Sequence, residues 1–324
     1  MGFPFSARRG ALLGGIAALA FGLNAAAADN WPSRPITFIV PSSPGGGTDI
    51  TARLLAEGVS RELKQSIVVD NKPGASGNIG AAATAKAAGD GYTFMVAATP
   101  SIAVNEYLYK NLPYNVETDL KPVARAFDSP LFWVVLANSP YKTLADMLEA
   151  GKRDPGKISF GSAGQGSPTY LGVKGIENKT GASFTHVPYK GMAASVQDFL
   201  GGRIQFLLSD PAMIKPYIES GKVRALATSV KSPLFPDLPV WTDKGLPGVP
   251  QSFSVMAPGT TPDAIVQAMS RAVNKVMQDP ATEKRIIDLG FIPTIDTPAK
   301  FGAQLKDERA MWKSLIERNH ITIE

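Results

Sequence analysis

The chain has 324 residues, of which 44% are hydrophobic and 19% are charged. This composition is typical of a globular protein and excludes a disordered or fibrous chain. The length predicts about two domains. The absence of cysteine excludes disulfides, thiol nucleophiles, cysteine-ligated metals and a lipid-modified N-terminal cysteine. With only two histidines, His186 and His320, no metal site is expected.

Residues 1–28 predict a secretory signal peptide. Arg8-Arg9 precedes a short apolar stretch that ends at Leu23, and small residues lead to Ala28 before Asp29. Cleavage after Ala28 removes two arginines and lowers the formal net charge from +5 to +3. We therefore expect a periplasmic protein without a lipid anchor. The sequence leaves open whether export follows the general secretory or the twin-arginine route.

The charged residues do not indicate a nucleic-acid partner. The sequence contains no run of Lys and Arg with interleaved aromatic residues, which is the usual mark of nucleic-acid binding. The small positive charge favours an anionic ligand instead.

Short apolar stretches alternate with segments of helical periodicity along most of the chain. The first five are a strand at 36–40, a helix at 50–64, a strand at 67–70, a helix at 78–88 and a strand at 92–98. This βαβαβ order predicts a parallel sheet with right-handed crossovers. Further strands are predicted at 131–136, 158–161, 184–187, 204–208, 223–228 and 253–257, and further helices at 143–151, 169–180, 192–200, 212–220, 262–278, 281–289 and 298–319.

Two segments indicate that the chain passes between two lobes. Residues 117–130 have mixed polarity and lead into an apolar strand, and residues 223–232 show the reverse order. If both cross, residues 127–229 form one domain, and residues 29–126 and 230–324 together form the other. The hinges then lie near 122–130 and 226–234. From the residues alone, two domains in tandem remain the alternative.

Two glycine-rich turns, each between a strand and a helix, are the best candidates for a binding site. The first runs from Pro41 to Asp49, with Thr48 or Asp49 expected as the helix N-cap, and the second runs from Ser159 to Tyr170. Glycine permits close backbone approach, and a helix start offers unpaired amides with partial positive charge. Each turn is therefore suited to a carboxylate, phosphate or sulfate. A third such turn, Lys72–Asn78, either lines the same cleft or only shapes the fold.

The candidate ligand-binding residues come from these turns and from neighbouring strand ends. Asp210 follows a predicted strand and either accepts a hydrogen bond from a ligand or caps the next helix. The full set is Ser43, Pro44, Gly45, Gly46, Thr48, Asp49, Ala98, Thr99, Ser162, Ala163, Gly164, Gly166, Ser167, Tyr170 and Asp210.

Common enzyme signatures are absent. The chain has no nucleophile elbow, dinucleotide fingerprint or phosphate-binding P-loop, so neither catalytic residues nor a cofactor is expected. Neither binding turn contains Lys or Arg, which suits a small carboxylate better than a triphosphate. His186 is interpreted as a structural residue. The alternative is a secreted serine hydrolase that uses Ser76 or Ser167, with His186 as the base.

Several short motifs together resemble the periplasmic substrate-binding proteins of tripartite tricarboxylate transporters, the Bug family. They are Trp31–Ile36, Pro41–Asp49, Asn71–Gly80, Asp90–Thr93, Leu112–Tyr114, Ser162–Ser167, His186–Gly191 and Gly221–Ala227. The resemblance covers essentially the whole mature chain. Three positions differ from the family's usual pattern: Ser42, Tyr170 and the Ser209–Pro211 segment.

The resemblance implies an α/β, two-lobed periplasmic binding protein, a Venus flytrap of type II topology. Each lobe is then a doubly wound, mostly parallel sheet with flanking helices. It implies a monomer that binds a small carboxylate (a di- or tricarboxylate, an acidic amino acid or an aromatic acid) and delivers it to a membrane permease. Tyr170 and Phe160 favour a flat or aromatic acid. The alternative to uptake is that the liganded protein acts as a sensor and signals to a membrane kinase.

Overall fold

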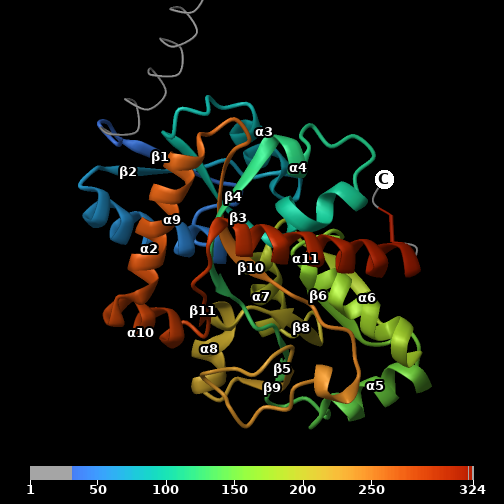
Figure 1. Ribbon diagram of the computed structural model, residues 1–324. Helices are drawn as coiled ribbons and strands as arrows, with labels where there is room; N and C mark the ends of the chain where they lie inside the picture. The colour runs from blue at the N-terminus through green and yellow to red at the C-terminus, as the bar shows by residue number, and fades with distance from the viewer. Residues whose placement is uncertain (1–30, 320, 323–324) are drawn as a thin grey trace, which may run out of the picture.

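The computed structural model describes residues 31–319 and 321–322, so the predicted signal peptide lies outside the described residues. The chain forms two lobes, each built on one mixed sheet with helices on both faces (Figure 1). This architecture confirms the predicted fold class. Among the described residues, no helix combines the length and the apolar character needed to cross a lipid bilayer.

The first sheet has six strands, in the order β11, β4, β10, β3, β1 and β2. β1 pairs in parallel with both β2 and β3, which confirms the predicted βαβαβ unit. β10 runs antiparallel between β3 and β4. The bounds are β1 (Ile36–Val40), β2 (Ile67–Asn71), β3 (Thr93–Ala98), β4 (Leu120–Asp128), β10 (Ser252–Pro258) and β11 (Ile292–Pro293).

The second sheet has five strands and repeats this arrangement, in the order β7, β6, β8, β5 and β9. β6 is parallel to β7 and β8, while β5 runs antiparallel between β8 and β9. In each sheet the antiparallel inner strand is the one that enters from the other lobe. The bounds are β5 (Phe132–Leu136), β6 (Ser159–Ser162), β7 (Thr185–Pro188), β8 (Phe206–Ser209) and β9 (Val223–Thr228).

The chain passes between the sheets twice, once from β4 to β5 and once from β9 to β10. The proline-rich segment before β10 packs on the second lobe. The Phe235 ring meets Phe132 edge-on at a centroid distance of 5.7 Å, and Val240 pairs with Thr228 at the end of β9. The residue boundaries of the two domains stay a prediction.

Helices cover both faces of each sheet. In the first lobe, α2 and α9 cover one face and α3 and α11 the other. In the second lobe, α5 and α6 cover one face and α7 and α8 the other. The bounds are α2 (Gly47–Leu63), α3 (Asn78–Ala85), α4 (Val116–Asp119), α5 (Leu144–Arg153), α6 (Pro168–Thr180), α7 (Met192–Leu200), α8 (Pro211–Glu219), α9 (Asp263–Gln278), α10 (Pro280–Asp288) and α11 (Pro298–Arg318).

Helix α11 belongs to the first lobe but reaches the second (Figure 1). Near its start, Phe301 is fully buried in the core, and near its end Leu315 lies against Gly175 of α6. Asn319, just after the helix, hydrogen-bonds with Asn178 of α6. The last helix therefore contacts both lobes.

Strand β4 was not predicted as a strand, because Lys121, Pro122 and Arg125 break its apolar pattern. Arg125 is nevertheless almost buried, and it is neutralised by Asp128 at 2.6 Å and Glu308 at 3.3 Å. Glu308 lies on α11, far from Arg125 in sequence. The local sequence around β4 therefore does not show that the charge of Arg125 is neutralised.

The contact between α2 and α9 depends on Gly58. A Cβ atom at this position would lie 2.4 and 2.7 Å from the two methyl carbons of Val276. The valine is buried and β-branched, so it has little freedom to move aside.

We therefore predict that Gly58→Ala lowers the free energy of unfolding by about 1–2 kcal/mol, because overpacking outweighs the gain in helix propensity. The matched control is Gly302→Ala on α11, whose new Cβ would meet nothing closer than 3.8 Å. This control should be neutral or stabilising by up to ~1 kcal/mol. Urea denaturation of both variants measures the difference, and equal effects would contradict the prediction.

Candidate functional site

The first glycine-rich turn joins β1 to α2. Gly45 has a φ of +80°, which glycine adopts without strain, and Gly46 is the helix N-cap in an extended conformation. The expected cap at Thr48 or Asp49 is wrong, because the helix already begins at Gly47 and no side chain caps it. The amides of the first turn therefore have no capping side chain to satisfy them. Gly47 must also be small, since its Cβ would lie 3.2 Å from the Phe253 ring.

Asp49 stabilises this turn from within. Its buried carboxylate accepts hydrogen bonds from the Gly45 amide at 2.9 Å, Arg53 Nε at 2.9 Å and Asn71 Nδ2 at 3.0 Å. Burial alone would raise the pKa of Asp49, but these donors outweigh it and hold the pKa below its usual range. Asp49 thus stays ionised and fixes the turn to β2 and α2.

The third glycine-rich turn, between β2 and α3, packs beside the first. Its Gly74, Ala75, Ser76 and Gly77 all have positive φ angles, between +48° and +122°. The Ser76 carbonyl oxygen accepts from Asn105, and Tyr109 donates to the Ser76 hydroxyl. A Cβ on Gly77 or Gly80 would meet Pro41 at 3.3 or 2.8 Å. The structure therefore brings two of the three turns together at the carboxyl edge of the first sheet.

The second glycine-rich turn joins β6 to α6. Ser167 caps the helix by accepting from the Tyr170 amide at 3.3 Å, and its own hydroxyl donates to the Gly164 carbonyl oxygen at 2.6 Å. Thr169 lies 2.9 Å from the Ser167 hydroxyl. Gly164 has a φ of +117°, so this turn also requires glycine. The predicted residues from Ser162 to Tyr170 thus form one local unit.

His186 on β7 supports this turn. Its Nε2 lies 2.7 Å from the hydroxyl of Ser162, and that hydroxyl also accepts from the Gly164 amide at 3.1 Å. Burial, with a smaller effect from Lys174, lowers the pKa of His186 to about 4, so the imidazole is neutral near pH 7. This geometry fits the structural role interpreted from the sequence. The histidine bonds with a fully buried serine, and not with Ser76 or Ser167.

Aromatic rings continue from His186 into the core. Tyr170 lies over His186 at a centroid distance of 4.5 Å, and Phe160 lies 4.9 Å from the same imidazole. Tyr170 is half-buried, whereas Phe160 is fully buried beneath it. Only Tyr170 of this pair reaches the surface in this structure, and Phe160 acts as packing.

Thr99 and Asp210 lie at two strand ends that meet between the lobes. Thr99 follows β3 and accepts from the Ser252 amide at 2.9 Å, while Asp210 follows β8 and accepts from Gln251 at 2.5 Å. Because Gln251 and Ser252 are adjacent in the chain, the carboxyl ends of β3 and β8 are close. β1 is the parallel neighbour of β3, and β6 is the parallel neighbour of β8. The first and second turns therefore each lie one strand away from this junction.

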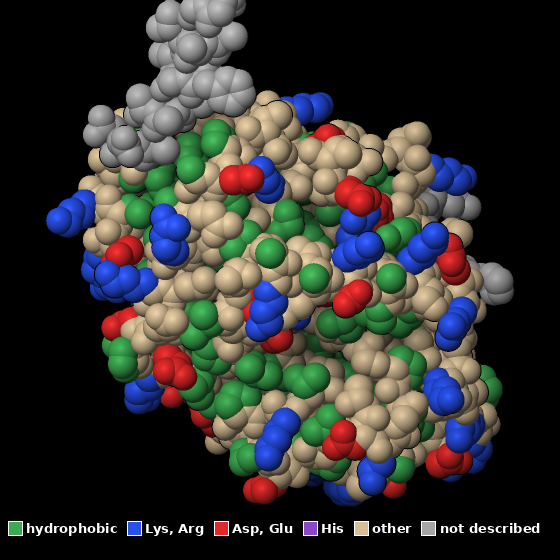
Figure 2. Space-filling view, viewed as in Figure 1, with side chains coloured by type: hydrophobic (Ala, Val, Ile, Leu, Met, Phe, Trp, Pro, Cys, Tyr) green, Lys and Arg blue, Asp and Glu red, His purple; other side chains and the backbone are tan. Residues whose placement is uncertain are grey.

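Two of the cations near the turns are paired with acids. Arg53 bonds with Asp49, and Lys174 lies 2.5 Å from Glu177. On the face seen in Figure 2, basic and acidic side chains are interspersed and do not gather by sign. Within the described ranges, no group of three His, Asp or Glu side chains is arranged to hold a metal. The turns therefore offer amides and hydroxyls as donors.

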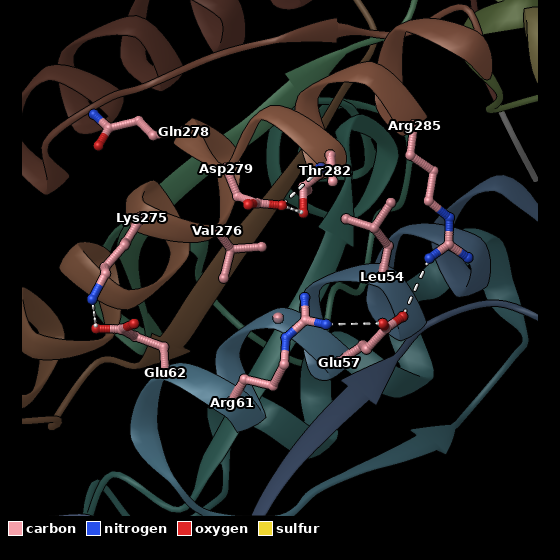
Figure 3. Close-up of a pocket in the computed structure, with 12 residues that line it drawn as sticks. Leu54, Glu57, Arg61, Glu62, Lys275, Val276, Gln278, Asp279, Thr282 and Arg285 are labelled. Atoms are coloured by element: carbon pink, nitrogen blue, oxygen red, sulfur yellow. Dashed lines mark hydrogen bonds and ion pairs between the residues drawn. The ribbon is translucent and has the colours of Figure 1, made fainter.

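Two surface cavities lie away from the predicted binding residues. One of about 680 Å³ lies among α2, α9 and α10, and another of about 470 Å³ lies beside α3. In the larger one, Arg61 and Arg285 both point to Glu57, and Lys275 points to Glu62 (Figure 3). Each of these three basic side chains therefore has an acidic partner at the wall of the cavity.

The fold and these turns define a class: a two-lobed periplasmic binding protein whose candidate site uses strand-to-helix corners. The family model for the tripartite tricarboxylate transporter family receptor matches residues 51–321. The chain belongs to this family, which comprises periplasmic solute-binding proteins.

Individual relatives agree with this assignment. Protein BugT of Bordetella pertussis is 36% identical over 294 residues, which cover 89% of this chain and 90% of BugT. The solved structure of R. palustris Rpa4515 with adipate has a TM-score of 0.85 and 31% identity, covering 90% of this chain and all of that one. MatC from Rhodopseudomonas palustris with bound malate has a TM-score of 0.81 and 26% identity, covering 88% of this chain and all of MatC.

Protonation of His186 provides a test of its role in the second turn. In the folded protein its pKa is about 4, below the ordinary 6.5, so the unfolded chain takes up a proton first as the pH falls. The stabilising contribution of His186 is therefore complete above about pH 6.5 and is lost as the pH falls to about 4.

We predict that the stability advantage of the native protein over His186→Gln, which does not titrate, falls by about 1–2 kcal/mol between pH 7 and pH 4, after allowance for solvent screening. Urea denaturation at several pH values measures this difference. A difference that stays constant across the range would show that His186 has no depressed pKa.

Proposed function

We propose that the chain is an extracytoplasmic solute-binding protein that captures a small carboxylate between its lobes. It would then deliver the acid to the membrane subunits of a tripartite tricarboxylate-type transporter. The observation that carries the proposal is the placement of the first and second glycine-rich turns, hereafter the first and second corners. There is one in each lobe, and both lie beside the same junction of β3 and β8. The adipate in Rpa4515 and the malate in MatC support a carboxylate as the ligand class.

The chemistry of the corners supports an organic acid. Amides at a helix start present aligned N–H groups and about half a positive charge, which suits a carboxylate oxygen. An acid with two carboxylates has one for each corner. Closure of the lobes would remove water from both carboxylates, and hydrogen bonds from fixed donors would replace the lost hydration.

The half-buried Tyr170 next to the second corner limits the shape of the ligand. Its ring packs on His186, and its main-chain amide donates to Ser167, the helix cap. A planar or extended acid chain would pass such a ring more easily than a branched one. We propose location in the periplasm and action as a monomer, in agreement with the sequence-based prediction.

Thermal denaturation with a panel of acids tests the ligand class. We predict that dicarboxylates such as adipate and malate raise Tm in a dose-dependent way, because a ligand that binds only the native state stabilises it. The diamide of adipic acid, which keeps the shape but has no charge, should leave Tm unchanged. No shift with any organic acid up to about 10 mM would contradict the proposal.

Ser167 allows a sharper test of the second corner. We predict that Ser167→Ala lowers stability by about 1 kcal/mol through loss of the cap and also weakens binding of the acid found above. The matched control is Thr297→Ala, which removes the equivalent cap of α11, where Thr297 accepts from the Lys300 amide at 3.2 Å. The control should lose similar stability and bind with unchanged Kd by isothermal titration calorimetry. Equal Kd values for both variants would show that the second corner does not contribute to ligand binding.

A further inference from the structure

Both passages of the chain between the lobes are bonded to a single carboxylate. Ser129 lies in the first passage and donates to Asp210 Oδ1 at 2.5 Å. Gln251 lies at the end of the second passage and donates through Nε2 to the same oxygen, also at 2.5 Å. The two passages also bond with each other, from the Ser129 amide to the Gln251 carbonyl oxygen at 2.8 Å. Asp210 itself belongs to the second lobe, directly after β8.

The position of Asp210 is not explained by helix capping. It occupies the N-cap position of α8, yet its side chain makes no capping bond. Its carboxylate is almost fully buried, and its side-chain partners in the described chain are Ser129 and Gln251. A buried carboxylate with neutral donors is costly to keep. Its bonds hold the two passages rather than the helix.

On the other side of the passages, a second set of bonds leads into the first lobe. Asp128 precedes Ser129 and pairs with Arg125, which in turn pairs with Glu308 of α11. Glu308 accepts from Thr99 at the end of β3, and the Thr99 hydroxyl accepts from the Ser252 amide, next to Gln251. Together with the peptide links Asp128–Ser129 and Gln251–Ser252, these bonds form a closed ring. Within this ring, Asp210 is the residue that belongs to the second sheet's side of the passages.

We propose that Asp210 is a positioning residue for ligand capture: by fastening both passages to the second lobe, its carboxylate limits how freely the lobes move and so sets the affinity for the ligand. This inference rests on the proposed function for its ligand. If these bonds are weakened, the lobes move more freely in the unliganded protein. Closure on a ligand then costs more conformational entropy, and the affinity for the ligand falls. The proposal concerns the passages themselves and not a contact with the ligand.

The ionisation of Asp210 makes the proposal measurable. Burial raises the pKa of this carboxyl to about 6, and the bond from Ser129 offsets this only in part. Burial also raises the pKa of Asp128 and Glu308, which face the passages from the first lobe beside Arg125, and Asp296 acts on Arg125 and Asp128. On α8, Lys215 is paired with Glu219. Asp128 and Glu308 therefore also titrate near Asp210. A comparison of variants is needed to separate the effect of Asp210 from theirs.

The test compares the native protein, Asp210→Asn and Asp296→Asn. Asp296 is a control for burial and charge, because it is equally buried and also acts on Arg125 and Asp128, but its carboxylate pairs with Lys300 at 2.6 Å and not with Ser129 or Gln251. Isothermal titration calorimetry with adipate or malate gives Kd between about pH 5 and pH 7.5. Protonation of the ligand is common to all three proteins and cancels in the comparison. Ser129→Ala provides a milder variant if Asp210→Asn does not fold.

We expect the native protein and Asp296→Asn to lose affinity in parallel as the pH falls. Asp210→Asn should bind the acid about tenfold more weakly than the native protein at pH 7.5. This difference in Kd should disappear towards pH 5, because Asp210 of the native protein is then protonated and also uncharged. The same Kd and the same pH profile in Asp210→Asn and the native protein would overturn the proposal.

A second readout needs no ligand. Because the chain has no cysteine, Lys86→Cys and Lys190→Cys place one spin label on each lobe at exposed positions. Pulsed electron resonance should show a broader distribution of label distances in Asp210→Asn than in the native background. An unchanged distribution would overturn the inference even if ligands bind normally. Failure of all acids to bind, with a broadened distribution, would reject the proposed function and keep the role of Asp210.

Discussion

The two passages of the chain between the sheets lie side by side, and the rest of the structure depends on this constraint. Ser129 and Gln251 bond through their main chains at 2.8 Å, so strands β5 and β10 enter their sheets from the same place. Each becomes the antiparallel inner strand beside β8 or β3. The carboxyl ends of β3 and β8 are thereby fixed next to the passages. Because β1 and β6 are the parallel neighbours of those strands, the two glycine-rich corners follow them to the same junction.

In the proposed function these corners bind an acid through amides and hydroxyls, and their glycines are required by packing as much as by conformation. A side chain at Gly47 would press on Phe253, and one at Gly80, in the helix after the third turn, would collide with the main chain of the first turn at Pro41. Two basic groups near the corners are already paired, Arg53 with Asp49 and Lys174 with Glu177. Fixed amides suit this task, because they neutralise an acid without a long side chain that must first be ordered. In the proposed function, discrimination among acids depends on the shape of the ligand, with the ring of Tyr170 as one wall of the site.

The alternation of short apolar strands and amphipathic helices was sufficient to predict most strands of both sheets and most helices. Strand β4 was missed, since the burial of Arg125 depends on Glu308, 183 residues away. The start of α2 was misplaced because glycines gave no capping signal. The turns themselves were found from their glycines. The contact of the third turn with Pro41 and the bond between His186 and Ser162 join distant segments, and no local pattern contains them.

Asp210 shows most clearly how a candidate residue can be chosen for one reason and placed for another. Its position after β8 predicted either a ligand contact or a helix cap, yet its carboxylate accepts from Ser129 and Gln251. A hydrophobic residue of similar size would avoid the cost of burying a carboxylate, and would often give a more stable protein. It would also leave the buried donors of Ser129 and Gln251 without a partner, which is costly in turn. The acid and its two donors therefore depend on one another, and they join three segments that are distant in sequence at the place where the chain passes between the lobes. A change in lobe orientation must either preserve these bonds and turn on the first-lobe side of Ser129, or break them. In the first case the carboxylate holds both passages during the motion, and in the second case the loss of its bonds adds to the cost of the motion.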